Sequence, residues 1–172
     1  MGKFGAGKFG AGKFGAGKFG AALGLLVCAG PVVADCAPGT VELRTAAGSV
    51  VRFSVEVADD AAERDLGLMN RQRLASSAGM LFVYEAPKHA YFWMKNTLIP
   101  LDMIFVDATG LVSRVHQGAI PLDETPIDGG EGVTYVLEIN GGLAGRLGLA
   151  AGSVLRADVI DQSMAAWTCG SE

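Results

Sequence analysis

The sequence predicts one mostly β domain, either a β-barrel or a jelly-roll-like β-sandwich, with two short α-helices. Half of the 172 residues are hydrophobic and 19% are charged, which is typical of a globular protein with a buried core. Short apolar or alternating runs recur along the chain with Gly, Pro, Asn and Asp between them, a pattern typical of all-β folds. Two segments carry helix signals, and both are short.

The first elements of the domain are predicted to be a hairpin and a helix. Apolar and polar residues alternate in Val41–Leu43 and in Val50–Val57, with a glycine turn between the two runs, which indicates two half-buried strands. Asp59 or Asp60 can then cap a helix. This helix should run for about two and a half turns, because Gly67 weakens it.

The later elements are apolar runs bounded by turn residues. Pro87 is expected to end one strand, and the prolines and glycines of Pro121–Gly132 predict a long loop. The predicted strands are Met80–Ala86, His89–Lys95, Leu101–Val106, Leu111–Gln117, Val133–Ile139 and Ser153–Ile160. A second helix is expected at Gly141–Leu147, ended by Gly148.

Residues 1–34 have the pattern of a secretory signal peptide. Residues 2–21 are four copies of GKFGA, which supply lysines and no acid, and the apolar run AALGLLVCAGPVVA leads to a small-x-small cleavage site. We therefore expect cleavage between Ala34 and Asp35 and one domain over residues 35–172, located in the periplasm or secreted. The alternatives are an artificial or low-complexity tail, a membrane anchor, and a lipoprotein attached through Cys28. The apolar run is shorter than the roughly 20 residues of a membrane span.

Two cysteines remain in residues 35–172, Cys36 and Cys169, one near each end. In an oxidising compartment the natural pairing joins them, and the alternative is two free thiols. The chain-entropy model gives such a bridge roughly 4–5 kcal/mol as an upper estimate. A zinc site is not expected, because cysteine pairs at metal-ligand spacing are missing and histidines are few.

The predicted mature chain is acidic. It has 10 basic and 18 acidic residues, so its net charge is 10 − 18 = −8. An acidic chain without a basic stripe argues against nucleic acid and anionic membranes as partners. We expect no nucleic-acid partner and no stable membrane insertion after cleavage.

A polar group interrupts two apolar runs in HAYFWMKNTLIPLDMIFVD, residues 89–107. Lys95, Asn96 and Thr97 form either a turn or the mouth of a pocket. Asn96 tolerates a left-handed backbone and favours a turn. Thr97 is expected to be structural, and both interpretations stay open for Lys95 and Asn96. Trp93 offers a stacking surface, although bulky residues on both faces of its strand predict that it is covered.

Two carboxylates lie inside strongly apolar strands, Asp102 in LIPLDMIFV and Glu138 in YVLEI. A buried carboxylate needs a partner or its pKa rises. Lys95, Arg71 and Arg64 are the expected partners of Asp102. The two carboxylates form either a binding or acid–base site or structural ion pairs. The candidate ligand-binding residues are Arg71, Trp93, Lys95, Asn96, Asp102 and Glu138.

Familiar enzyme motifs are missing from the sequence. It contains no G-x-S-x-G, P-loop, H-E-x-x-H or post-strand G-x-G-x-x-G pattern, so no catalytic residue is identified. The methionines are interpreted as core filling rather than as ligands of a soft metal. No metal and no cofactor are expected.

Three segments resemble the DUF192 family. They are RDLGLMNR (64–71), GMLFVYEAPKHAYFWMKNTLIPLDMIFVD (79–107) and YVLEINGGLAGRLGLAAGSVL (135–155). The resemblance covers roughly residues 41–159 and implies a small, mostly β domain, often exported, with no established activity. The GKFGA repeats depart from the family pattern.

Three functional hypotheses follow. The preferred one is an exported domain that binds a small polar ligand or a partner through a cleft near Lys95, Asn96 and Asp102. The second is a hydrolase or lyase with Asp102 and Glu138 as acid and base. The third is a structural or assembly protein of the envelope with a large exposed apolar patch as its partner surface.

Overall fold

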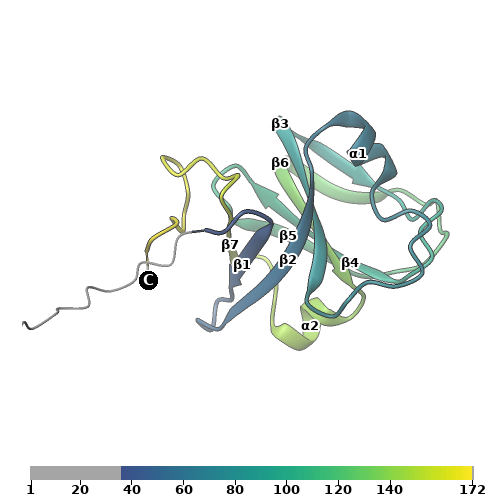
Figure 1. Ribbon diagram of the computed structural model, residues 1–172, viewed down its shortest axis with the longest axis horizontal. Coiled ribbons are helices and arrows are strands. Elements are labelled where there is room, and N and C mark those ends of the chain that lie inside the picture. Colours follow the sequence, from purple (N-terminus) through teal and green to yellow (C-terminus); the bar gives the residue numbers. More distant parts are fainter. Residues whose placement is uncertain (1–35, 172) are drawn as a thin grey trace, which may run out of the picture. The chain divides into compact units, whose positions relative to one another are not determined.

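The computed structural model describes residues 36–171, which form a mostly β domain with two short helices (Figure 1). The strands are β1 (Thr40–Arg44), β2 (Val50–Ala58), β3 (Ala78–Phe92), β4 (Leu101–Asp107), β5 (Val112–Ala119), β6 (Ile127–Asn140) and β7 (Val154–Arg156). The helices are α1 (Ala61–Leu66) and α2 (Leu143–Leu147). The predicted signal peptide, residues 1–34, lies outside the described residues.

The seven strands form one sheet with the order β5-β4-β6-β3-β2-β1-β7. All neighbouring strands are antiparallel except β2 and β3, which are parallel and are connected through α1. The sheet curls into a half-barrel (Figure 1), and an isolated bridge between Leu111 and Val154 joins its two edges. The predicted mostly β class is confirmed, and a single curled sheet corresponds to the barrel alternative.

Pro87 does not end a strand, contrary to the prediction, because β3 continues through it from Ala78 to Phe92. The register of β3 against β6 shifts between Val83 and Lys88. A proline is tolerated at such an irregularity because the ladder needs no N–H there. The two strands predicted on either side of Pro87 are therefore one long strand.

Two further predicted boundaries are wrong. Part of the predicted loop Pro121–Gly132 belongs to β6, which begins at Ile127 because the extension of β3 supplies its partner residues. The predicted strand Ser153–Ile160 shrinks to Val154–Arg156, since β1 pairs with only these three residues of β7.

Helix α1 begins at a predicted cap but is shorter than predicted, because it ends at Gly67, a residue expected only to weaken it. Asp60 caps it by accepting a hydrogen bond of 2.8 Å from the Glu63 N–H. It spans six residues and ends at Gly67, whose φ of 49° is in the range that glycine favours. The Arg64 guanidinium fastens the helix to the sheet by donating to the carbonyls of Asp59 (2.6 Å) and Val83 (2.8 Å).

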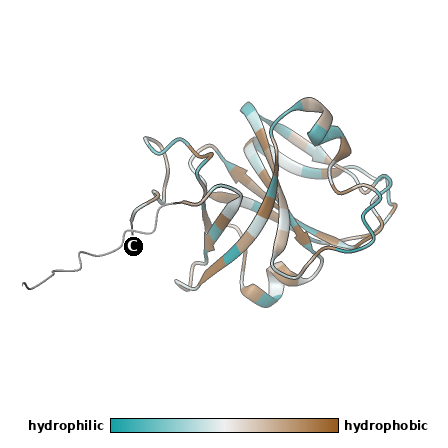
Figure 2. Cartoon of the chain, viewed as in Figure 1, coloured by the Kyte–Doolittle hydropathy of each residue, from teal (hydrophilic) through white to brown (hydrophobic). Residues whose placement is uncertain are grey.

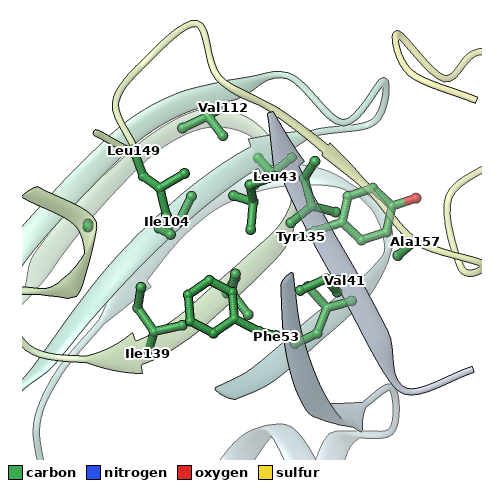
Figure 3. Close-up of a cluster of buried hydrophobic side chains, with 14 of the residues drawn as sticks. Val41, Leu43, Phe53, Ile104, Val112, Tyr135, Ile139, Leu149 and Ala157 are labelled. Atoms are coloured by element: carbon green, nitrogen blue, oxygen red, sulfur yellow. The ribbon is translucent and has the colours of Figure 1, made fainter. Parts of the chain in front are cut away.

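The sheet buries apolar side chains on both of its faces, in two separate clusters. One cluster includes Leu43, Phe53 and Ile139 and is shown in Figure 3. The other includes Phe82, Met103 and Phe105 and lies on the α1 side. Because side chains alternate between the faces of a strand, consecutive residues of β4 and β6 serve different clusters. Hydrophobic and hydrophilic residues follow one another along the strands in Figure 2.

Cys36 and Cys169 form a disulfide, which confirms the predicted pairing. The bridge links residues separated by 133 positions in the sequence and fastens the C-terminal segment beside β1 and β7. The Trp167 ring of this segment contacts two guanidinium groups, with Arg156 at 4.0 Å and Arg44 at 4.5 Å from the ring centre. In the part of the chain that the structure describes, no helix combines the length and the apolar character needed to cross a membrane.

Candidate functional site

A pocket of about 920 Å³ lies between α1, β3 and the turn that follows β3. Its volume is within the range of small-molecule binding sites. Helix α1 and the residues after it form one wall, β3 forms the opposite wall, and Glu138 of β6 contributes to the lining between them. Of the predicted site residues, the pocket brings together Trp93, Lys95, Asn96 and Glu138.

Glu138 is the buried ionisable group of this pocket. Its cross-strand neighbours are Met80 on β3 and Met103 on β4, which shield it from water and offer no strong hydrogen bond. The residue is only 4% exposed, and its carboxyl forms no hydrogen bond or ion pair within residues 36–171. Burial raises the pKa of Glu138 to about 8. At neutral pH the carboxyl is therefore largely protonated and can donate a hydrogen bond to a molecule in the pocket.

Aromatic side chains form much of the β3 wall. Phe82 and Phe92 meet edge to face with their ring centres 5.2 Å apart, and Tyr84 is half-buried beside them. Burial raises the pKa of the Tyr84 hydroxyl, and the positive charge of Arg64 offsets part of this rise. At the mouth, Tyr91 is 59% and Trp93 is 48% exposed. The prediction that both faces of this segment are covered is therefore wrong.

Two lysines lie on aromatic rings of the pocket. The Lys88 ammonium is 4.5 Å from the centre of the Tyr84 ring, and the Lys95 ammonium is 4.9 Å from the centre of the Trp93 ring. These distances are typical of cation–π contacts. Arg64 also lines the pocket, but its guanidinium is engaged by backbone carbonyls and by Glu85 at 3.2 Å.

The polar group at residues 95–97 is both a turn and part of the pocket. Asn96 has a φ of 53°, so the predicted left-handed backbone is observed. Its carbonyl accepts a hydrogen bond of 2.8 Å from the Asn70 N–H, which joins this turn to the segment after α1. Thr97 is buried, and its hydroxyl donates to the Lys95 carbonyl at 3.3 Å, in agreement with a structural role.

Asp102 does not line the pocket and has none of the predicted cationic partners. Its carboxylate accepts three backbone hydrogen bonds, from Gly118 (2.7 Å), Gly142 (2.9 Å) and Ala144 (2.8 Å). These contacts join β4 to β5 and to the start of α2, whose own cap residue, Gly142, has no side chain. Asp102 is therefore a buried structural residue, because its acceptor capacity is used inside the fold.

The predicted acid–base pair is not formed. Asp102 lies opposite Ile139 and Met103 lies opposite Glu138 in the β4–β6 ladder. Since consecutive side chains point to opposite faces, the Asp102 and Glu138 carboxyl groups lie on different sides of the sheet. The hypothesis of a hydrolase or lyase with these two groups as acid and base is therefore wrong.

Arg71 is another predicted site residue that lies outside the pocket lining. Its guanidinium makes two hydrogen bonds of 2.6 Å to the Glu56 carboxylate. This bidentate geometry is favourable for an arginine–carboxylate pair and holds the segment after α1 against β2. Arg71 is thus occupied by a partner on the protein itself.

Phe82, Tyr84 and Lys88 are among the pocket residues that sequence reasoning missed. The spacing of Met80, Phe82 and Tyr84 indicated that their side chains lie on one face of a strand, because residues two apart on a strand point the same way. Glu138 lies on the same face of the sheet as these residues because of the register between β3 and β6, and local sequence does not specify that register. No set of three or more His, Cys, Asp or Glu side chains in the described part of the chain is arranged to hold a metal ion.

Residues 42–157 match the model of DUF192, which is described as an uncharacterized ACR. The chain belongs to the DUF192 family. The family match spans β1 to β7 and includes Glu138 and all of the pocket lining. No curated protein matches the chain.

Two solved structures are similar to this DUF192 domain. The first is the crystal structure of a candidate transcription regulator from Sinorhizobium meliloti 1021, with 41% identity, a TM-score of 0.68, and coverage of 71% of this chain and 95% of that chain. The second is a protein of unknown function from Novosphingobium aromaticivorans DSM 12444, with 42% identity, a TM-score of 0.66, and coverage of 68% and 83%.

Replacing Asp102 tests its structural role. We expect Asp102→Asn to lower the free energy of unfolding by roughly 2–4 kcal/mol, because an NH₂ donor would then face a buried backbone N–H. Chemical denaturation measures this change. The matched control is Asp123→Asn, at an exposed carboxylate that accepts one hydrogen bond from the Thr125 N–H at 2.9 Å, where we expect less than about 1 kcal/mol. Equal losses in the two variants would contradict the role.

Replacing Glu138 tests its burial through pH. The pKa is about 8 in the folded state against the ordinary value of 4.5, so unfolding releases a proton between these pH values and stability falls as pH rises. Glu138→Gln removes this loss. The variant should match wild type near pH 4 and be more stable by roughly 3–5 kcal/mol above pH 8.

Denaturation at a series of pH values measures the difference in unfolding free energy between the variant and wild type. Glu124→Gln is the control, because Glu124 is exposed and outside the pocket, and its difference should stay flat across the same range. A difference for Glu138→Gln that is also independent of pH would contradict the raised pKa.

Proposed function

We propose that this chain is an exported binding domain that takes up a small amphipathic molecule in the pocket between α1 and β3. The observation that carries the proposal is the Glu138 carboxyl, which lines this pocket, is nearly fully buried and has no partner within residues 36–171. A buried polar group without a partner costs free energy. A ligand that accepts its hydrogen bond would offset that cost.

The lining supports an amphipathic ligand. Phe82, Tyr84 and Phe92 offer apolar and aromatic contact near Glu138. Lys88 places its charge on the half-buried Tyr84 ring, and Lys95 places its charge on the more exposed Trp93 ring. Pockets that bind small molecules combine a mostly apolar lining with a few polar groups that fix orientation. Binding without chemistry is the simpler role, since the acid–base partner proposed for Glu138 lies on the other face of the sheet.

Two features support export. The N-terminal sequence combines a basic segment, an apolar run and a small-x-small cleavage site. The disulfide between Cys36 and Cys169 is a bond that persists in oxidising compartments such as the periplasm. We propose that the domain encounters its ligand in such an oxidising compartment, outside the cytoplasm.

The similar structure described as a candidate transcription regulator suggests DNA as an alternative partner. The composition of the present chain speaks against it, because residues 35–172 carry 10 basic and 18 acidic residues and a DNA-binding domain needs a basic surface. The small-molecule proposal therefore stands ahead of nucleic-acid binding.

Probe binding tests the pocket. We expect 2-naphthylacetate or its neutral amide, 2-naphthylacetamide, to bind with a Kd below about 1 mM, as measured by isothermal titration calorimetry. Ala61→Trp should weaken binding at least about tenfold by filling the pocket, because Ala61 lines it. Ala62→Trp is the matched control, since Ala62 is exposed on the same helix but does not line the pocket. Failure of both probes, or equal effects of the two tryptophans, would overturn the proposal.

The N-terminus of the protein tests export. When the full chain is produced in a Gram-negative host, we expect the periplasmic fraction to contain a chain that begins at Asp35, as identified by N-terminal sequencing. Ala34→Arg should block this cleavage, because the site needs a small residue. A chain that remains uncleaved in the cytoplasm would contradict the export part of the proposal and leave the pocket part standing.

A further inference from the structure

Lysine is unevenly distributed in this domain. Residues 36–171 contain two lysines, Lys88 and Lys95, and both line the pocket. Lys88 extends from β3, and Lys95 belongs to the turn after that strand. The lysine charges of the described domain thus converge on one concave surface.

Neither lysine forms an ion pair on the protein within residues 36–171, although the charge of Lys88 acts on the Glu85 carboxylate. Each ammonium lies on an aromatic ring. A ring contact leaves N–H donors of the ammonium group free. Both groups are therefore available to an anion that enters the pocket.

The charge balance of the lining has the opposite sign to that of the domain. The lining holds three cations, Arg64, Lys88 and Lys95, and two exposed acids, Asp65 and Glu85. With Glu138 protonated, the charge of the lining is 3 − 2 = +1, whereas the charge of residues 35–172 is 10 − 17 = −7. A local positive charge on an acidic protein favours an anionic ligand at this site.

We infer that the pocket takes an amphipathic anion, whose acidic group is held by Lys88 and Lys95 at the mouth and whose opposite end offers a hydrogen-bond acceptor to Glu138. The inference rests on the proposed function and names the ligand class for that pocket. The acidic group belongs to a small molecule rather than to a polypeptide, because Glu138 and the aromatic rings near it lie in the buried part of the pocket.

The same two lysines disfavour a cationic ligand. A cationic ligand would meet Lys88 and Lys95 at the mouth and would have to compete with them for the faces of Tyr84 and Trp93. Of the three acids in the lining, Asp65 is exposed and Glu85 is paired with Arg64. Burial between Met80 and Met103 opposes ionisation of the third, Glu138, so cationic groups outnumber ionised acids around the pocket. An anion does not have to displace the lysines from the aromatic rings, and it does not require Glu138 to ionise.

Three probes with one apolar body test the sign of the charge. They are 2-naphthylacetate, 2-naphthylacetamide and 2-(2-naphthyl)ethylamine, which are anionic, neutral and cationic at pH 7. We expect the acid to bind at least about tenfold more tightly than the amide and the amine at low salt. The advantage over the amide should shrink as salt rises, because salt screens exposed charges.

Lysine variants test whether the tighter binding of the acid depends on Lys88 and Lys95 at the mouth of the pocket. Lys88→Gln and Lys95→Gln should each weaken binding of the acid about threefold to tenfold and leave the amide within about twofold. Arg73→Gln is the control, since it removes the same charge from an exposed residue outside the lining. A loss of acid binding as large in Arg73→Gln as in the lysine variants would overturn the inference.

Glu138 variants test the deep end with 2-naphthol, whose hydroxyl oxygen accepts a hydrogen bond. Glu138→Gln keeps a neutral donor and should retain 2-naphthol within about threefold, whereas Glu138→Leu should lose about tenfold.

If all probes bind with equal affinity, or the amine binds best, the anion inference fails while the proposed pocket stands. If no probe binds, the proposed function fails as well. Binding of acidic peptides but not of 2-naphthylacetate would overturn the small-molecule assignment.

Discussion

The pairing of β6 with β3 on one side and β4 on the other is the constraint on which the domain depends. Because side chains alternate along each strand, this central strand places Leu137 and Ile139 in one buried cluster and Val136 in the other. Glu138 falls on the same face as Val136, between Met80 and Met103. The same register that builds two hydrophobic clusters therefore buries a carboxyl at the pocket.

Two carboxylates in apolar strands have opposite fates in this fold. Asp102 meets the backbone N–H groups of Gly118, Gly142 and Ala144 and becomes part of the scaffold. Glu138 has methionines as cross-strand neighbours and retains an unused hydrogen-bonding group at the pocket. A carboxylate whose bonds are satisfied internally stabilises a fold, whereas one without partners is a candidate for ligand recognition. This physical difference distinguishes Asp102, which is structural, from Glu138, which is a candidate for ligand recognition.

The sequence was a good guide wherever local chemistry decides the structure. The cap at Asp60, the left-handed Asn96 and the β1–β2 hairpin all agree with prediction. The distant pairing of Cys36 with Cys169 was also predictable, because residues 35–172 contain only these two cysteines. The sequence otherwise failed where distant segments decide. The continuation of β3 through Pro87 depends on β6, and the environments of Asp102 and Glu138 depend on a register between strands that are far apart in sequence. Four of the six predicted site residues line the pocket, and three of them, Trp93, Lys95 and Asn96, could be found together because they lie close in sequence around one turn.

The most direct test of the account is the titration of the Glu138 side chain itself. Carbon-13 NMR of the glutamate carboxyl carbons, with the Glu138 signal assigned through its loss in Glu138→Gln, reports the protonation state of this one group as pH changes. We predict a midpoint near 8, well above the ordinary value of 4.5. A midpoint near 4.5 would mean that the carboxyl is solvated or paired. The buried, unpartnered group on which the proposed pocket rests would then not exist.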